Sequence, residues 1–205
     1  MERKLQVFVS STYADLIKER QAAVEAILTA GHIPAGMELF AAGDESQMEA
    51  INRWIEESDV YLLILGGPYG SIEQHSGKSY TELEYDYAVS INKPFFACVV
   101  SSNAQEERLK QYGSGVLEQD NPALLRAFRK KVTSKMCRFW TDTKDIKLSI
   151  LETLSNFARR EELIGWVRGN EPANAVALAE EVARLAKENT ELRQQWSDTV
   201  GEPFS

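Results

Sequence analysis

The chain has 205 residues, of which 23 are lysine or arginine and 31 are aspartate or glutamate, giving a formal charge of −8. This acidic balance argues against a general nucleic-acid-binding protein, which needs a basic face to neutralise phosphates. Apolar residues make up 43% and charged residues 26%, the composition of a globular protein. The longest apolar run, residues 60–67, is far shorter than the roughly 20 residues that cross a membrane, so no membrane partner is expected.

Cysteine and histidine are scarce. Cys98 and Cys137 lie in apolar stretches without CxxC spacing, which predicts two reduced thiols in the core of a cytoplasmic protein. His32 and His75 are the only histidines, so a metal site with several histidines is excluded, as is acid–base chemistry that needs several imidazoles. We therefore expect no metal and no bound cofactor.

Strand and helix patterns alternate along the first 160 residues. The run at residues 59–66 is apolar without alternation, which is typical of a strand buried on both faces of a parallel sheet. Strand patterns lie at residues 4–10, 32–35, 59–66, 93–100 and 136–140, and helix patterns at 12–30, 48–55, 79–91, 122–131 and 143–160. Residues 101–117 are polar and contain glycine, which predicts a loop or insertion. This order predicts a doubly wound α/β domain with five parallel strands over residues 1–162.

Thr12 and Ser79 each begin a segment with the spacing of a helix cap. Thr12 with Asp15 predicts that the first helix begins near residue 12, and Ser79 with Glu82 predicts the start of the third. Gly31 stands where a glycine commonly ends a helix.

Residues 171–197 carry a different pattern. Positions three and four residues apart form a heptad seam: Leu178, Val182, Leu185, Asn189, Leu192 and Trp196. Leucine at position d with one asparagine at position a favours a parallel two-stranded coiled coil. We expect a homodimer through this helix, with residues 163–170 as a linker and 198–205 as a tail. The alternative is a helix that packs against its own domain.

The end of the first strand is a candidate ligand-binding segment. Ligands of an open parallel sheet lie beyond the carboxyl ends of its strands. Ser10, Ser11 and Thr12 follow the first strand and open a helix, where hydroxyl and free N–H groups can bind a phosphate. The alternative is that Ser11 or Thr12 only caps the helix.

Glu84 is the candidate functional carboxylate. Glu82 has the spacing of a capping box with Ser79, whereas Glu84 has no such role. Thr81, Glu84 and Ala88 share one helical face, and the small Ala88 predicts close approach to the sheet. A buried carboxylate there is costly unless it has a function. The alternative is a solvated glutamate.

Two tyrosines lie near the same edge of the predicted sheet. Tyr69 follows the third strand, and Tyr80 opens the helix that carries Glu84. Either ring can stack on a base or a nicotinamide, or pack in the core.

Four blocks resemble, in order, an uncharacterised domain family: residues 7–27, 36–40, 58–72 and 77–88. That family is found at the N-terminus of predicted NACHT and WD-repeat signal-transduction ATPases, and bacterial members often carry a coiled coil. It is similar to TIR domains and to nucleoside deoxyribosyltransferases, which share a flavodoxin-like topology. The resemblance implies a flavodoxin-like sheet, a cytoplasmic bacterial setting, a role in antiviral defence and a fused or separate signalling ATPase as a partner.

The resemblance also implies site residues. Both better-known groups can cleave an N-glycosidic bond with one glutamate on the helix after the third strand. In the transferases this glutamate follows a threonine by three residues and precedes an alanine by four, a spacing held here by Thr81, Glu84 and Ala88. The glycine usual two residues after the glutamate is Asp86 here.

Two further segments follow from the resemblance. The phosphate side of the site maps onto Ser10 and Ser11, and Met37 with Glu38 falls where TIR domains carry the loop after the second strand. We count Glu38 among the expected substrate-binding residues.

Three functions are compatible with these patterns. The first is an enzyme, activated by self-association, that hydrolyses the N-glycosidic bond of NAD or a related nucleotide. The second is a non-catalytic signalling adaptor that oligomerises. The third is a sensor that binds a nucleotide without turning it over. The sequence leaves open whether the domain is an enzyme.

Overall fold

The computed structural model describes residues 3–36, 47–167 and 173–200, and for residues 173–178, 195 and 197–200 it describes the helical backbone alone. The chain divides into two compact units, one formed by residues 3–166 and the other containing the C-terminal helix. The first unit extends to Trp166, whose backbone pairs with that of Lys4 through hydrogen bonds of 2.7 and 2.9 Å. Residues 163–166 of the predicted linker therefore belong to the first unit.

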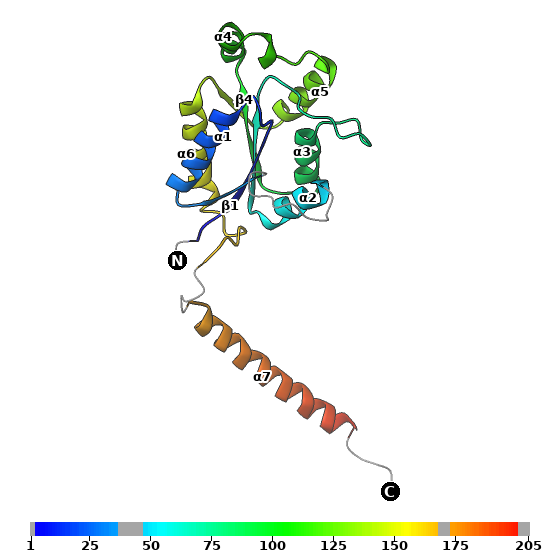
Figure 1. Ribbon diagram of the computed structural model, residues 1–205. Coiled ribbons are helices and arrows are strands. Elements are labelled where there is room, and N and C mark those ends of the chain that lie inside the picture. Colours follow the sequence, from blue (N-terminus) through cyan, green and yellow to red (C-terminus); the bar gives the residue numbers. More distant parts are fainter. Residues whose placement is uncertain (1–2, 37–46, 168–172, 201–205) are drawn as a thin grey trace. The chain divides into compact units, whose positions relative to one another are not determined.

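The first unit is built on a parallel sheet of five strands in the order β2-β1-β3-β4-β5 (Figure 1). The strands are β1 (Gln6–Ser11), β2 (Ile33–Ala35), β3 (Val60–Leu65), β4 (Phe95–Val100) and β5 (Arg138–Trp140). The order changes direction between β1 and β3, and this order is that of flavodoxin-like folds. The predicted α/β fold is thus confirmed, and the carboxyl ends of β1 and β3 mark the crevice where such folds bind ligands.

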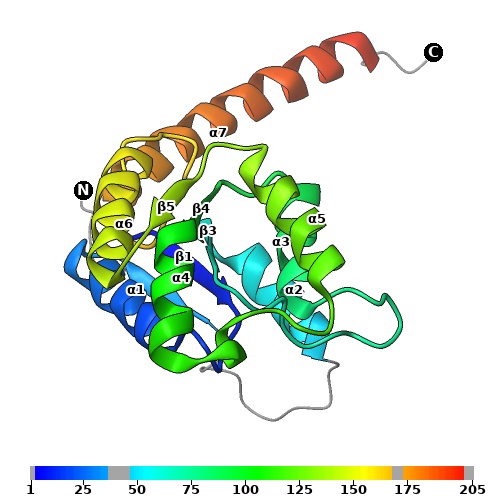
Figure 2. The same ribbon diagram turned by 90° about the horizontal axis from the view of Figure 1, so that it is seen from above.

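Helices cover both faces of the sheet, as Figure 2 shows from above. They are α1 (Ile17–Thr29), α2 (Gln47–Glu57), α3 (Tyr80–Ser90), α4 (Ser102–Tyr112), α5 (Pro122–Thr133) and α6 (Thr143–Phe157). α1 and α6 lie on one face, whereas α2, α3 and α5 lie on the other. Alternate residues of the strands enter two separate cores, since Val7 and Val9 pack on the α1 side and Phe8 on the α3 side.

The expectation of a loop at residues 101–117 is wrong. This segment forms α4 and a short 3-10 turn, Ser114–Val116. Ser101 caps α4 by accepting a hydrogen bond of 3.2 Å from the backbone N–H of Ala104, and Gly113 ends it with a φ of 76°. Only Ala104 of this helix is buried, so α4 has no apolar stripe that helical periodicity can reveal.

The start of α1 also differs from the prediction. The helix begins at Ile17, and its cap position is Leu16, which makes no side-chain cap. Thr12 and Asp15 therefore lie in the β1–α1 connection rather than at a cap. Leu16 is completely buried in the core, and this packing takes the place of a polar cap at the start of the helix.

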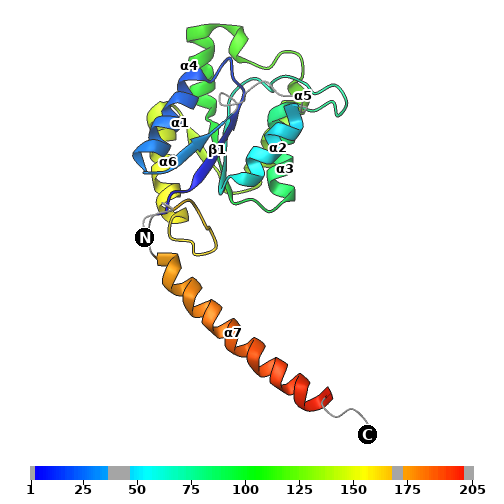
Figure 3. The same ribbon diagram turned by 60° about the horizontal axis from the view of Figure 1, so that its bottom comes forward.

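α7 (Ala173–Val200) is one continuous helix, visible in Figure 3. On its surface Arg184 forms ion pairs with Glu181 at 2.7 Å and Glu188 at 3.1 Å, the i,i+3 and i,i+4 contacts of a solvent-exposed helix. Pairing of this helix with another stays a prediction. Within the described part of the chain, every helix is too short or too polar to span a membrane.

Candidate functional site

Glu84 lies on the buried face of α3. Ser79 caps this helix, because its hydroxyl accepts a hydrogen bond of 3.2 Å from the backbone N–H of Glu82. The predicted shared face is present, since Thr81, Glu84 and Ala88 are 5%, 2% and 0% exposed. The small Ala88 side chain lets α3 approach the sheet, so the Glu84 carboxylate is held inside the protein rather than in solvent.

Glu84 meets β1 in the carboxyl half of that strand, and Tyr61, near the start of β3, lies in the same core. The Ser10 hydroxyl, on β1, donates a hydrogen bond to the Glu84 carboxylate. Tyr61 of β3 stacks its ring on Phe8, with centroids 6.0 Å apart. Among the described residues the Tyr61 hydroxyl has no hydrogen-bond partner, although it is fully buried. Three polar side chains thus project into an otherwise apolar core beneath the crevice.

The environment of Glu84 changes its acidity. Burial raises the pKa of Glu84 to about 7, while the hydrogen bond from Ser10 and the charge of Arg20 act in the opposite direction. Burial and then the negative charge of Glu84 hold the pKa of Tyr61 well above its ordinary value. At neutral pH, Glu84 therefore exchanges between its protonated and ionised forms.

Glu82, two residues away, has a different environment. Its carboxylate accepts a hydrogen bond of 2.6 Å from the Tyr69 hydroxyl and forms an ion pair with Lys131 of α5. Lys131 also bonds Asp86 at 2.8 Å. The predicted capping box is only half formed, since Ser79 accepts from the Glu82 backbone but the carboxylate points to α5 instead. Glu82 is a partnered structural carboxylate.

Of the two alternatives that the sequence left open for the tyrosines, Tyr69 follows core packing, whereas the stacking role of Tyr80 stays a prediction. Tyr69 is 1% exposed, packs edge-on against Phe128 at 6.3 Å and donates its backbone N–H to Glu118 at 2.6 Å. It is therefore a core residue, because neither ring face is free for a base. Tyr80 is half-buried against the same cluster.

The β3–α3 connection runs between the end of β1 and the start of α3. Gly70 has a φ of +96°, and a β-carbon at this position would lie 2.9 Å from Thr12 Cγ2 and 3.7 Å from Thr81 Oγ1. Thr12 and Thr81 are thus brought together around a position that favours glycine. Other residues rarely adopt this φ, and a β-carbon would lie too close to Thr12. The Thr12 hydroxyl is a buried polar atom with no hydrogen-bond partner among the described residues.

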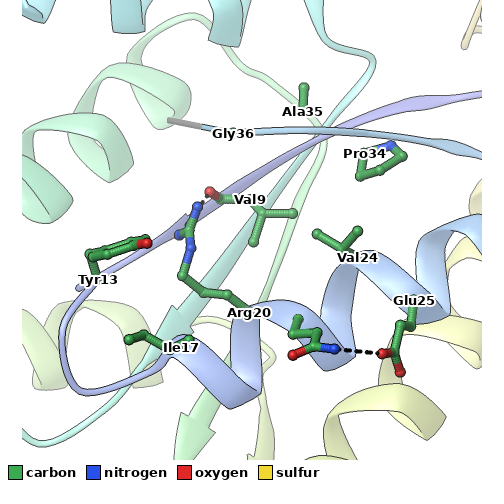
Figure 4. A pocket seen from close by; sticks show the side chains of 10 residues that line it. Val9, Tyr13, Ile17, Arg20, Val24, Glu25, Pro34, Ala35 and Gly36 are labelled. Carbon is green, nitrogen blue, oxygen red and sulfur yellow. Dashed lines mark hydrogen bonds between the residues drawn. The ribbon is translucent and has the colours of Figure 1, made fainter. Parts of the chain in front are cut away.

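Ser11 lies on the opposite face of the sheet from Ser10. Its hydroxyl accepts a hydrogen bond of 2.8 Å from the Arg20 guanidinium, which also donates to the Val9 carbonyl at 3.3 Å. Arg20 is 4% exposed and lies beside a pocket of about 520 Å³ between α1 and β2 (Figure 4). The Ser10 and Ser11 hydroxyls therefore face opposite sides of the sheet, as successive strand residues do, and their predicted role in binding phosphate stays a prediction.

Sequence reasoning missed two arginines. Arg20 shares a helical face with Ala23 and Ile27. A charged residue within this apolar stripe could have indicated a buried arginine from the sequence. Arg108 of α4 pairs with Glu19 at 2.6 Å and donates to the backbone carbonyl of Asp15 at 2.7 Å, joining α4 to α1. It was missed because α4 itself was not predicted.

Asp15 is a half-buried acid at the crevice. Burial raises its pKa, and a β-carbon at Gly66 would lie 2.8 Å from its Oδ2 atom. Glu38 and Met37 lie outside the described residues. Cys98 is buried and Cys137 is half-buried, and both are free thiols. In the described ranges, no group of three or more His, Cys, Asp or Glu side chains is placed to hold a metal ion.

Solved structures with this fold come from several kinds of protein. The TIR domains of the activated Roq1 resistosome, which directly recognises the pathogen effector XopQ, align over 74% of this chain and 99% of theirs, with 12% identity and a TM-score of 0.50. A CMP N-glycosidase from Clostridium botulinum aligns over 74% and 98%, with 13% identity and a TM-score of 0.42. A flavo di-iron protein from Thermotoga maritima aligns over 78% and 37%, with 14% identity and a TM-score of 0.42. At these identities the likeness to TIR domains is one of fold.

Comparison of sequences gives a more specific result. No curated protein sequence matches the chain. Residues 6–155, from the start of β1 to α6, match the family described as a domain of unknown function, DUF4062. This match spans the whole sheet, including Ser10 and Glu84, and covers well over half of the chain, which therefore belongs to the DUF4062 family.

Proposed function

We propose that this chain is a TIR-like effector domain that hydrolyses the N-glycosidic bond of NAD or a related nucleotide. Glu84 is the group that faces the ribose. The observation that carries the proposal is the Glu84 carboxylate, which is 2% exposed, hydrogen-bonded by Ser10 and has a pKa raised to about 7. Strongly shifted acids near a ligand crevice are characteristic of functional sites.

The chemistry needs one well-placed carboxylate. When the bond between the ribose C1′ and the nicotinamide nitrogen breaks, its electron pair leaves with the nicotinamide, which becomes neutral, and the ribose gains oxocarbenium character. A carboxylate about 3 Å from C1′ stabilises that cation or adds to it covalently. Water then forms the new C1′–O bond and releases a proton. Because nicotinamide leaves without protonation, no histidine is required.

The burial of Glu84 strengthens this effect. A charge–charge interaction is larger in the protein interior than in water, so an ionised Glu84 stabilises a cationic transition state more than a solvated glutamate does. The same burial destabilises the ionised form in the resting protein, as the raised pKa shows. The ionised carboxylate therefore stabilises the positively charged transition state more than it stabilises the bound substrate, and this difference accelerates the reaction.

Ser10 is the positioning residue in this proposal. Its hydroxyl donates to Glu84 and holds the carboxylate in one orientation between β1 and α3. Tyr61, locked by its stacking on Phe8, places a second hydroxyl in the same core. Both side chains come from strands, which fix a site more rigidly than loops do.

The second candidate is a non-catalytic signalling domain that acts with a fused or separate ATPase. The specific observation in its favour is the same 2% exposure, because the Glu84 carboxylate contacts a ribose only after the side chains around it move. The TIR domains with the same fold belong to a resistosome, an assembly, and that supports either candidate as a signalling protein.

The test is base release from NAD, NADP and deoxynucleosides, measured by chromatography over a range of protein concentrations. We expect the wild type to release nicotinamide and Glu84→Gln to release none while keeping the same circular dichroism spectrum. Glu82→Gln is the matched control, since it changes a buried carboxylate on the same helix that is already bonded to Tyr69 and Lys131.

Two results would decide against the proposal that Glu84 carries an enzymatic activity. A folded wild type that is inactive on all three substrate classes at every concentration supports the adaptor. Equal activity in wild type and Glu84→Gln removes Glu84 from the mechanism. Release that grows faster than linearly with protein concentration would support activation by self-association.

A further inference from the structure

The helix α7 exposes a heptad seam that is apolar except for Asn189. Its members repeat at intervals of three and four residues, and those with described side chains are mostly exposed: Val182 (58%), Leu185 (49%), Leu192 (57%) and Trp196 (70%). Charged residues outside the seam form ion pairs along the helix, and the other residues there include Ala179, Ala183 and Ala186. A helix with one apolar stripe of heptad spacing has the pattern that buries against a second helix.

We infer that α7 pairs in parallel and in register with α7 of a second copy of this chain. The inference does not depend on the proposed function. Asn189 is the first argument, because it lies within the seam between Leu185 and Leu192 and is exposed in the single chain. A lone asparagine at position a meets its own copy only in a parallel, in-register pair, where the two amides hydrogen-bond to each other. Any other register leaves it opposite an apolar residue.

The charges beside the seam select the same arrangement. Position g carries Glu181 and Glu188, and position e of the last full heptad carries Arg193. In a parallel pair, Glu188 of one copy lies opposite Arg193 of the other, whereas an antiparallel pair places the g positions, and hence the glutamates, opposite one another. Within the described residues Arg193 forms no ion pair, so it is available to Glu188 of the second copy.

The length of the helix sets the expected strength. α7 has 28 residues, which at 1.5 Å per residue is about 42 Å. The seam covers about three heptads and contains one polar residue that lowers stability in exchange for register. We therefore expect a reversible dimer whose population rises with protein concentration, rather than a permanent one.

The first experiment is sedimentation velocity of the full chain over a wide concentration range. The mass should double from the 23.1 kDa of the single chain as concentration rises. Leu185→Asp with Leu192→Asp should leave it a monomer, with an unchanged thermal transition of the α/β domain. A monomer at every concentration, or a trimer, overturns the inference.

The second experiment tests the direction of pairing by exchange of charges. Glu188→Arg and Arg193→Glu should each weaken the dimer about tenfold, because each places two like-charged pairs across the interface. Mixing the two variants should restore association, since arginine on one chain then meets glutamate on the other in both pairs. Glu180→Arg, at the outward-facing position f, is the control and should leave the dimer constant unchanged.

Failure of the mixture to associate overturns parallel pairing even if dimers form. A cross-linking readout makes the same distinction. Leu192→Cys in a Cys137→Ser background should form a disulfide-linked dimer on oxidation, because Cys98 is buried and a parallel pair brings the two introduced thiols together. An antiparallel pair separates them, so its product would be the unlinked chain.

Discussion

The two buried carboxylates of α3 lie two residues apart and have opposite surroundings. Glu82 is 7% exposed, ion-paired with Lys131 and hydrogen-bonded by Tyr69. Glu84 is 2% exposed and has the Ser10 hydroxyl as its hydrogen-bond donor, with Arg20 acting on it by charge alone. The sequence predicted Glu84 as the functional carboxylate and Glu82 as a capping residue, and both are inside the protein.

The comparison shows that burial by itself does not identify a functional acid. A buried carboxylate with an ammonium partner is the ordinary structural solution, because the partner offsets the loss of water. Among the residues that the structure describes, Glu84 has no ammonium or guanidinium ion pair, and burial raises its pKa to about 7. A buried acid without a charged partner destabilises the folded state. Because such destabilising groups are typical of functional sites, we assign the function to Glu84 rather than to Glu82.

The largest expected effect separates the two residues by activity. Glu84→Gln should lower base release by about 10³-fold or more, because it removes the charge that stabilises the oxocarbenium ion. Glu82→Gln should stay within about threefold of wild type, since the amide still accepts from Tyr69. The measurement is initial rate at saturating substrate. Similar losses in both variants would mean that the helix, rather than Glu84, is responsible.

The second effect is on stability as a function of pH. The folded protein keeps a proton on Glu84 up to about pH 7, whereas the unfolded chain releases it near the ordinary value of 4.5. Between these values the folded state binds more protons, so stability falls as pH rises. The difference in pKa corresponds to about 3 kcal/mol, complete above pH 7.

Glu84→Gln should remove that loss. Urea unfolding at pH 5 and pH 8 measures it, and the variant should be more stable than wild type at pH 8. Asp15, whose pKa burial also raises, contributes in the same direction in both proteins and cancels in the difference. If the free energy of unfolding changes equally between pH 5 and pH 8 in the wild type and in Glu84→Gln, the raised pKa of Glu84 is contradicted.

Much of the fold could be predicted because its signals are local. The strand at residues 59–66 is an apolar run, and Gly31, with a φ of +81°, marks the end of α1. α4 could not be predicted, because it buries one alanine and is defined by Ser101 and Gly113 at its two ends. Periodicity detects helices that bury an apolar stripe and does not detect a helix, such as α4, that buries a single residue.

The site around Glu84 could be predicted only in part, because some of its contacts join residues that are far apart in the sequence. The face that carries Glu84 follows from helical spacing, whereas its contact with Ser10 depends on the register of β1 against α3, 74 residues apart. Tyr61 lies in an apolar run where nothing distinguishes a buried hydroxyl from a buried ring. Ser11 was grouped with Ser10 by sequence adjacency, but the pleat of the strand separates them.

The third effect tests the partnered member of the pair. Lys131→Met should destabilise the fold by about 1–2 kcal/mol, because it leaves the Glu82 carboxylate buried with Tyr69 alone. Chemical denaturation measures the loss. Adding Glu82→Gln should recover most of it, since the double variant has no unpaired charge. If the double variant is no more stable than Lys131→Met, the ion pair to Glu82 is not what holds this contact, and Asp86 is the relevant partner.

The smallest effect concerns the hydrogen bond between Ser10 and Glu84. Ser10 lowers the pKa of Glu84, so Ser10→Ala should raise it above about 7 and move the midpoint of the activity–pH profile upward. The free energy of unfolding should fall by about 1 kcal/mol at pH 8, where the carboxylate is ionised and its hydrogen bond from Ser10 is strongest, and by less at pH 5.

Ser11→Ala is the matched control, because Ser11 bonds Arg20 on the other face of the sheet and its loss should not depend on the ionisation of Glu84. A shift in the activity profile for Ser10→Ala but not for Ser11→Ala assigns the titration to Glu84. Equal pH dependence in both variants would place the titrating group elsewhere, and Asp15 would then be the next acid to test.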